Sequence, residues 1–219
     1  EAWTKEAKGA ADFLNLLKKT AMFFGNTELA TTLGGYTGAT SVPYFFSLVA
    51  GFPSMLTRTF SEKIGAYDAM KFSYEIFQIA SSGLFTLSYF NPANAFAGTA
   101  GTVLDSLSHV TEVPTYAWDA KEALDLLNLA KKLKISDEVQ SGLSSRLQHS
   151  MLKLAKAVMT SVNGFFSSYT LVTGVALVAA ATALTLSLGA TICSVAEYYH
   201  QNYWTNYNVT NVTFIPQIT

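Results

Sequence analysis

Positively charged side chains are missing from the last 63 residues of the sequence, because Lys156 is the final lysine or arginine. Between Lys156 and Glu197, forty residues carry no formally charged side chain. In the whole chain only 13% of residues are charged, against about 25% in a soluble globular domain. So little charge cannot cover a water-facing surface of 219 residues, and the composition therefore predicts a membrane protein.

The scarce charges are clustered and balanced in sign. Uncharged stretches cover residues 29–57, 76–104 and 157–196, and each charged island outside them is close to neutral. A nucleic-acid surface or a polybasic lipid anchor would need a clustered basic excess, so both are excluded. Cys193 is the one cysteine, which excludes an internal disulfide or a multi-cysteine metal site. It is expected to be a buried structural thiol.

Two segments have the periodicity of amphipathic helices. In residues 2–24 an apolar face opposes a polar ridge made of Lys5, Lys8, Asp12, Asn15 and Lys19. We expect this helix to pack on the protein through its apolar face or to lie in the membrane interface. Residues 116–162, which follow Pro114, predict a water-facing antiparallel hairpin joined by a turn at residues 134–137.

Residues 40–107 contain one or two further apolar helices, spanning or half-inserted. Residues 29–57 are expected to be irregular, because glycines at residues 34–38 and prolines at Pro43 and Pro53 interrupt them. Residues 66–90 predict one long helix that ends at Asn91-Pro92. The following run to residue 107 is rich in alanine and glycine, which allows helices to approach closely within a bilayer.

A transmembrane helix is predicted at residues 165–196, continuing the helix before it, with a possible kink at Asn163-Gly164. This length exceeds the roughly 20 residues that cross a bilayer, and tyrosines and a tryptophan follow from Tyr198. The positive-inside rule then places residues 105–156 on the cytoplasmic, matrix or stromal side. The tail, residues 201–219, is expected on the opposite side, where Asn208 and Asn211 are potential glycosylation sites.

The sequence has no motif for catalysis, a metal or a cofactor. Asp105, His109 and Glu112 share one helical face and are the nearest thing to a site, although a polar cap at a helix end is the favoured interpretation. His149 is expected to be solvated, and neither it nor His200 has a metal-ligand spacing. We therefore predict no catalytic and no metal-binding residues, and the cofactor is left open.

The predicted fold is all-α: a helical integral membrane protein with one C-terminal transmembrane helix, further apolar helices and flanking amphipathic helices. The expected function is that of a non-enzymatic accessory, structural or assembly subunit. Its partners would be the lipid bilayer and other membrane subunits, through small-residue helix faces, and no nucleic acid. One alternative is a membrane-shaping protein. Another is a small transporter or channel component, less favoured because the sequence shows no charged pathway and no internal repeat.

Overall fold

The computed structural model describes residues 2–61 and 65–204, and 90% of the residues described are helical. Six α-helices follow one another: α1 (Ala2–Phe23), α2 (Thr27–Ser61), α3 (Ala66–Phe90), α4 (Ala95–Lys132), α5 (Asp137–Thr173) and α6 (Ala180–Tyr199). A short π-helix, η1 (His200–Trp204), extends α6. The described residues contain no strand, so the predicted all-α class is confirmed.

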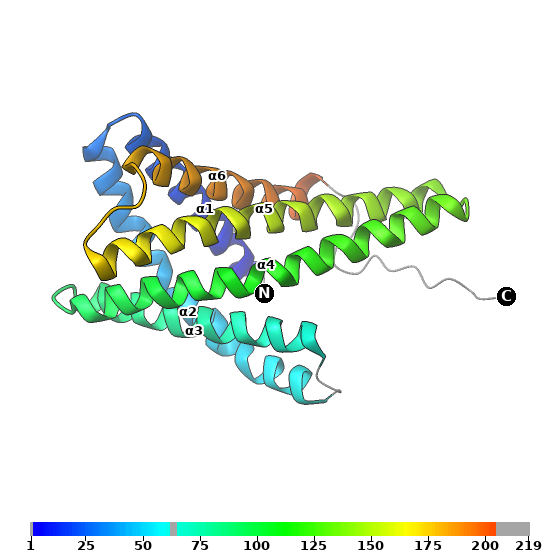
Figure 1. The fold of residues 1–219 in the computed structure, drawn as a ribbon, viewed down its shortest axis with the longest axis horizontal. Coiled ribbons are helices and arrows are strands. Elements are labelled where there is room, and N and C mark those ends of the chain that lie inside the picture. The colour runs from blue at the N-terminus through cyan, green and yellow to red at the C-terminus, as the bar shows by residue number, and fades with distance from the viewer. Residues whose placement is uncertain (1, 62–64, 205–219) are drawn as a thin grey trace.

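The helices form a closed ring in which each packs antiparallel to the next. Successive helices are in contact from α1 to α6, and α6 also packs against α1. Three connections, at residues 24–26, 91–94 and 174–179, therefore lie at one end of the bundle (Figure 1). The turn at residues 133–136 lies at the other end, where α4 and α5 project beyond their neighbours (Figure 1).

Prolines do not interrupt the helices as expected. α2 runs unbroken through its glycines and through Pro43 and Pro53, so the irregular segment predicted at residues 29–57 is wrong. α4 likewise passes through Pro114, which does not begin a new segment. Each proline removes one backbone hydrogen bond, and hydroxyl groups can offset such a loss within apolar helices.

The single transmembrane helix predicted at residues 165–196 is wrong, because the charge-free stretch folds back on itself. α5 continues through Asn163 and Gly164, as expected, but ends at Thr173. Gly174 adopts φ 73°, a left-handed conformation that glycine reaches without steric cost. Its N–H donates to the carbonyl of Thr170 at 2.8 Å. The chain then returns as α6, so the stretch forms two antiparallel helices.

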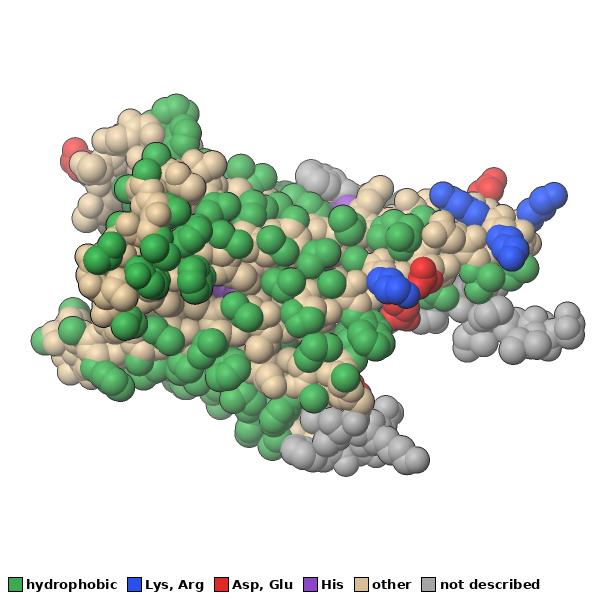
Figure 2. All heavy atoms as spheres, viewed as in Figure 1, with side chains coloured by type: hydrophobic (Ala, Val, Ile, Leu, Met, Phe, Trp, Pro, Cys, Tyr) green, Lys and Arg blue, Asp and Glu red, His purple; other side chains and the backbone are tan. Residues whose placement is uncertain are grey.

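The antiparallel hairpin predicted for residues 116–162 is confirmed, as the projecting halves of α4 and α5. Leu127, Ala130 and Leu143 are buried between the two helices. Arg146 forms an ion pair with Glu122 at 3.2 Å, and the remaining charges gather at the tip (Figure 2). The hairpin is longer than expected, because its two helices extend without interruption into the ring.

The burial pattern within the ring is inverted relative to a soluble protein. Among the described residues, eight of the eleven buried hydrophobic residues are alanines, whereas thirteen buried residues are polar or charged. Large apolar side chains instead cover the outside (Figure 2), among them Phe13, Phe46, Phe96, Phe165 and Val172. A water-soluble monomer rarely exposes so much contiguous apolar surface.

Every α-helix contains at least 20 residues, the length that crosses a hydrocarbon core of about 30 Å. Two stretches, Thr27–Thr57 and Ala180–Tyr203, are also apolar enough to cross a membrane. The second ends beside the middle of α5, since Nε2 of His200 lies 3.3 Å from Oε1 of Gln148. The side of the membrane on which the C-terminal tail lies, expected to be opposite residues 105–156, stays a prediction. Residues 205–219, with both potential glycosylation sites, lie outside the described residues.

Candidate functional site

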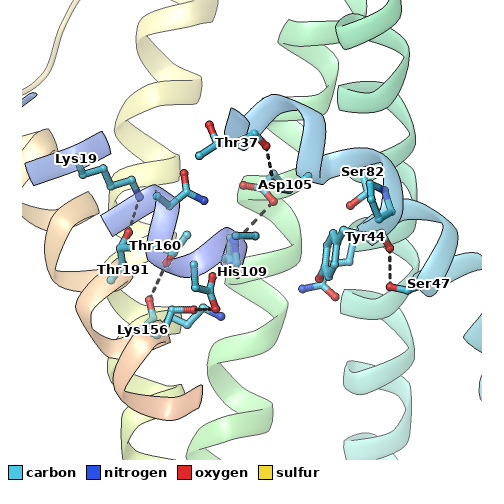
Figure 3. Close-up of a pocket in the computed structure, with 18 residues that line it drawn as sticks. Lys19, Thr37, Tyr44, Ser47, Ser82, Asp105, His109, Lys156, Thr160 and Thr191 are labelled. Atoms are coloured by element: carbon cyan, nitrogen blue, oxygen red, sulfur yellow. Dashed lines mark hydrogen bonds and ion pairs between the residues drawn. The ribbon is translucent and has the colours of Figure 1, made fainter. Parts of the chain in front are cut away.

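A polar cavity of about 380 Å³ lies at the centre of the ring, and all six helices contribute to its wall (Figure 3). Hydroxyl and amide side chains make up most of the lining. They are Asn15, Thr37, Thr40, Tyr44, Ser47, Gln78, Ser82, Thr160, Thr191 and Ser194. Five ionisable groups, Asp12, Lys19, Asp105, His109 and Lys156, join them. The sequence alone did not predict this gathering of charged side chains.

α1 directs its polar ridge into the cavity. Asp12 accepts a hydrogen bond from the hydroxyl of Ser194 at 2.9 Å. About two turns further along, Nζ of Lys19 donates to Oγ1 of Thr191 at 2.7 Å and to the carbonyl of Ser187 at 3.2 Å (Figure 3). These bonds join the first helix to the last and close the ring. The expected packing of α1 on the rest of the protein is confirmed, since α1 contacts α2 and α6, although Leu17 of its apolar face is exposed.

Lys156, the last basic residue of the sequence, also points inward from α5. Its Nζ lies 3.9 Å from Oε2 of Glu197 on α6, and both side chains are largely enclosed, with exposures of 23% and 7%. Thr160, one turn on, lines the same wall and donates to the carbonyl of Lys156 at 2.8 Å. The charge that marks the start of the apolar stretch is thus a cavity residue rather than a surface flank.

The sequence correctly predicts that Asp105, His109 and Glu112 share one face of a helix. Nδ1 of His109 lies 2.7 Å from Oε2 of Glu112, and its Nε2 lies 3.7 Å from Oδ1 of Asp105. Glu112 also accepts a hydrogen bond from the hydroxyl of Tyr116 at 2.7 Å. The group lies in the middle of α4 and not at a helix end, so its interpretation as a polar cap is wrong. Asp105 and His109 face the cavity, and Glu112 lies behind them.

The charges of the lining balance. Two lysines and two aspartates line the cavity together with hydroxyl groups, a set that can bind a small polar molecule through both signs of charge. The described residues contain no group of three histidine, cysteine or carboxylate side chains arranged to hold a metal ion.

The other two histidines lie together near the end of α6. His149 is buried, with 4% exposure, and its ring stacks on that of His200 at a centroid distance of 5.9 Å. The prediction that His149 is solvated is therefore wrong. Cys193 is half-buried rather than fully buried. Neither feature opens into the central cavity.

Sequence reasoning missed Asp12, Lys19 and Lys156 as cavity residues. The sequence indicates that Asp12 and Lys19 lie on the polar ridge of the N-terminal helix, but this ridge was expected on the outer surface of the protein. Lys156 had no such signal, because its position became clear only when α6 folded back beside it. Comparison with known proteins finds no matching family model, no matching curated protein and no matching solved structure.

Proposed function

We propose that the chain is an integral membrane protein whose central cavity provides a binding and passage site for a small polar solute. It would thus be a small transporter or a channel component. The observation that carries this proposal is the inverted distribution of side chains, with charged groups converging on the cavity and large apolar groups facing outward. Ionisable groups inside a lipid-embedded bundle are costly and usually face a functional cavity.

The ends of the ring suggest its orientation. The projecting α4–α5 hairpin carries Lys121, Lys131, Lys132 and Lys134, whereas the connections at residues 24–26, 91–94 and 174–179 contain no lysine or arginine. By the positive-inside rule the hairpin faces the cytoplasm or its equivalent. With six spanning helices, the first and last helices then begin and end on that same side.

The lining favours a zwitterionic solute. A site for a cation or an anion would carry a net charge of the opposite sign, but here lysines and aspartates are equal in number. A molecule with an ammonium and a carboxylate group could satisfy both signs, while the hydroxyl groups bind its remaining polar atoms. Charge-assisted hydrogen bonds of this kind are roughly twice as strong as neutral ones.

The accessory-subunit function predicted from the sequence stays a prediction, since an apolar outer surface suits lipid and neighbouring helices alike. The membrane-shaping alternative gains no support from α1. A surface-bound amphipathic helix needs its polar face in water, but Asp12 and Lys19 here bond to α6. The cavity is the feature that distinguishes solute passage from both alternatives.

Membrane integration is tested first, by extraction of the expressed protein. We expect the protein to stay with the membrane in alkaline carbonate and to leave it only in detergent. Release by carbonate alone would contradict both the membrane assignment and the passage function.

Solute passage is tested in vesicles that contain the purified protein, with uptake of labelled glycine as the zwitterionic probe and potassium and chloride as ionic controls. The variant Ser47→Trp places a large ring in the cavity and should abolish uptake. Its neighbour Phe46 is 63% exposed on the outside, so Phe46→Trp is the matched control and should preserve uptake. Equal uptake by the two variants, or none by the wild type, would contradict the proposal.

A further inference from the structure

We propose that a ladder of side chains on α4, Asp105–His109–Glu112–Tyr116, carries protons between the central cavity and the end of the bundle at which α4 and α5 project. Proton movement along this ladder would be coupled to passage of solute through the cavity. The inference rests on the proposed function, because it assigns a driving ion to the same site.

The four side chains recur at intervals of four, three and four residues, which places them along one face of the helix. Contacts of 3.7, 2.7 and 2.7 Å join them in order. Their exposure falls along the ladder, from 41% for the Asp105 side chain to 12% for His109 and 4% for Glu112. The ladder therefore leads from the open cavity into a region from which water is excluded.

A purely structural role explains the ladder poorly. Both hydrogen-bonding partners of Glu112, His109 and Tyr116, lie on α4 itself, so these bonds do not hold neighbouring helices together. α-Helix formation needs no such side-chain bonds, and burying a carboxyl group costs free energy. A histidine between two carboxyl groups is, by contrast, suited to proton transfer, because its two ring nitrogens exchange donor and acceptor roles near neutral pH.

Charged and titratable groups on the other helices surround the ladder. Lys156 interacts electrostatically with both Asp105 and Glu112. Lys153 lies over the ring of Tyr116 at 5.6 Å, and the Tyr74 ring on α3 lies 6.3 Å from that of Tyr116. The remaining groups that face the ladder or the cavity are Asp12 and Lys19 of α1, Tyr44 of α2 and Glu197 of α6. Lys156 and Lys153 can therefore compensate the negative charge that remains on a side chain of the ladder when its proton departs.

Each step moves one proton. A proton that enters from the cavity through Asp105 binds Nε2 of His109, and Nδ1 of the same ring releases its proton to Oε2 of Glu112. The 3.7 Å gap to Asp105 is closed by rotation of this half-exposed side chain or by a water molecule. The Tyr116 hydroxyl, which donates to Oε1 of Glu112, turns away and gives its proton to a water molecule toward the projecting end of the bundle as its oxygen accepts the proton of Glu112, so one proton enters and one leaves. The starting tautomer returns when Nε2 gives its proton to a water molecule of the cavity and Nδ1 takes one up from water.

The test measures proton flux and solute flux separately in the same vesicles. A potassium gradient with valinomycin sets the membrane potential, and trapped pyranine reports internal pH, while labelled glycine reports solute uptake. Wild-type vesicles should acidify faster than protein-free vesicles. Glu112→Gln and His109→Gln should reduce this proton flux by about tenfold or more, because a positioned acid or base contributes at least that much to proton transfer. Proton-driven glycine accumulation should be lost in both variants, while downhill glycine entry should persist in Glu112→Gln, because Glu112 lies behind the cavity wall.

Two controls address misfolding and surface charge. Tyr116→Phe keeps the ring and removes only the hydroxyl, and it should also reduce proton flux. Asp125→Asn removes a carboxylate from the exposed part of α4, where it pairs with Lys121, and should have no effect. Wild-type proton flux equal to that of empty vesicles, or unchanged flux in a folded Glu112→Gln variant, would overturn the relay. Glycine uptake without proton flux would reject the relay alone, whereas absence of both fluxes would reject the proposed function as well.

Discussion

α5 packs tightly against α4 where Gly164 meets Ser106. We therefore predict that the substitution Gly164→Ala, which adds one methyl group, pushes the two helices apart. A Cβ atom built at this position would lie 2.7 Å from Oγ, 3.0 Å from Cβ and 3.2 Å from Cα of Ser106. Rotation of the serine would relieve only the first contact, because Cβ and Cα are fixed to the backbone. Ser106 also bonds to Ser168 of α5 at 2.9 Å, so movement of the helices would strain this bond too.

The change in the free energy of unfolding on Gly164→Ala is the sum of two opposing effects. Replacing a helical glycine by alanine gains about 1 kcal/mol of helix propensity, while overpacking a tight contact costs about 1–3 kcal/mol. Gly35 lies within α2, and a Cβ atom there would meet nothing within 4 Å. The variant Gly35→Ala therefore gains the propensity without the cost. The difference between Gly164→Ala and Gly35→Ala isolates the overpacking, about 1–3 kcal/mol in the free energy of unfolding.

Thermal unfolding in detergent, followed by intrinsic fluorescence, measures this difference. At about 2–4 °C per kcal/mol for a chain of this size, Gly164→Ala should melt several degrees below Gly35→Ala. The double variant Gly164→Ala with Ser106→Gly should recover part of the loss, since only the 3.2 Å contact with Cα would then remain. A Gly164→Ala variant that melts at or above Gly35→Ala would refute the α4–α5 packing.

Two further predictions test the rest of the ring. Glu197→Gln should lower the free energy of unfolding by about 3 kcal/mol, the lower end for a broken buried ion pair, because its partner Lys156 is 23% exposed. Exchanging Lys156 and Glu197 should restore the melting temperature in detergent. A wild-type melting curve for Glu197→Gln would count against the ion pair. In a Cys193→Ser background, a single cysteine placed at Val175 and one placed at Lys134 should react with an impermeant maleimide from opposite sides of the membrane. Labelling of both cysteines from one side would reject the antiparallel arrangement of the helices.

The sequence predicts the helices better than the way in which they connect. The helix at residues 66–90 and the hairpin at residues 116–162 follow from strong periodicity and from Asn91-Pro92, and both are confirmed. The hairpin between α5 and α6 could not be predicted in this way, because Gly174 lies within an apolar run without any change of composition. Its left-handed φ of 73° is a property of the folded chain, since isolated glycines also occur inside continuous helices.

The candidate site was predictable only in part, for a reason that α1 illustrates. Periodicity shows that Asp12, Asn15 and Lys19 share a face, but it does not say whether that face meets outer solvent or an inner cavity. Local spacing likewise brings His109 and Glu112 together, because both are on one helix. The contacts of Asp12 with Ser194 and of Lys156 with Glu197 join residues on different helices, and no local pattern predicts them.

The same ambiguity explains how so little charge suffices for this fold. A ring of helices has two surfaces, and only the smaller, inner one is polar here, so a few ionisable groups cover it. The outer surface needs apolar side chains such as Phe13 and Phe165, while small residues such as Ala97 and Ala157 fill the contacts between helices. In a bilayer this division would leave the apolar groups in lipid and keep the charged groups of the ring inside it. The low charge content and the charged cavity thus have one physical cause, the exclusion of polar groups from the outer surface.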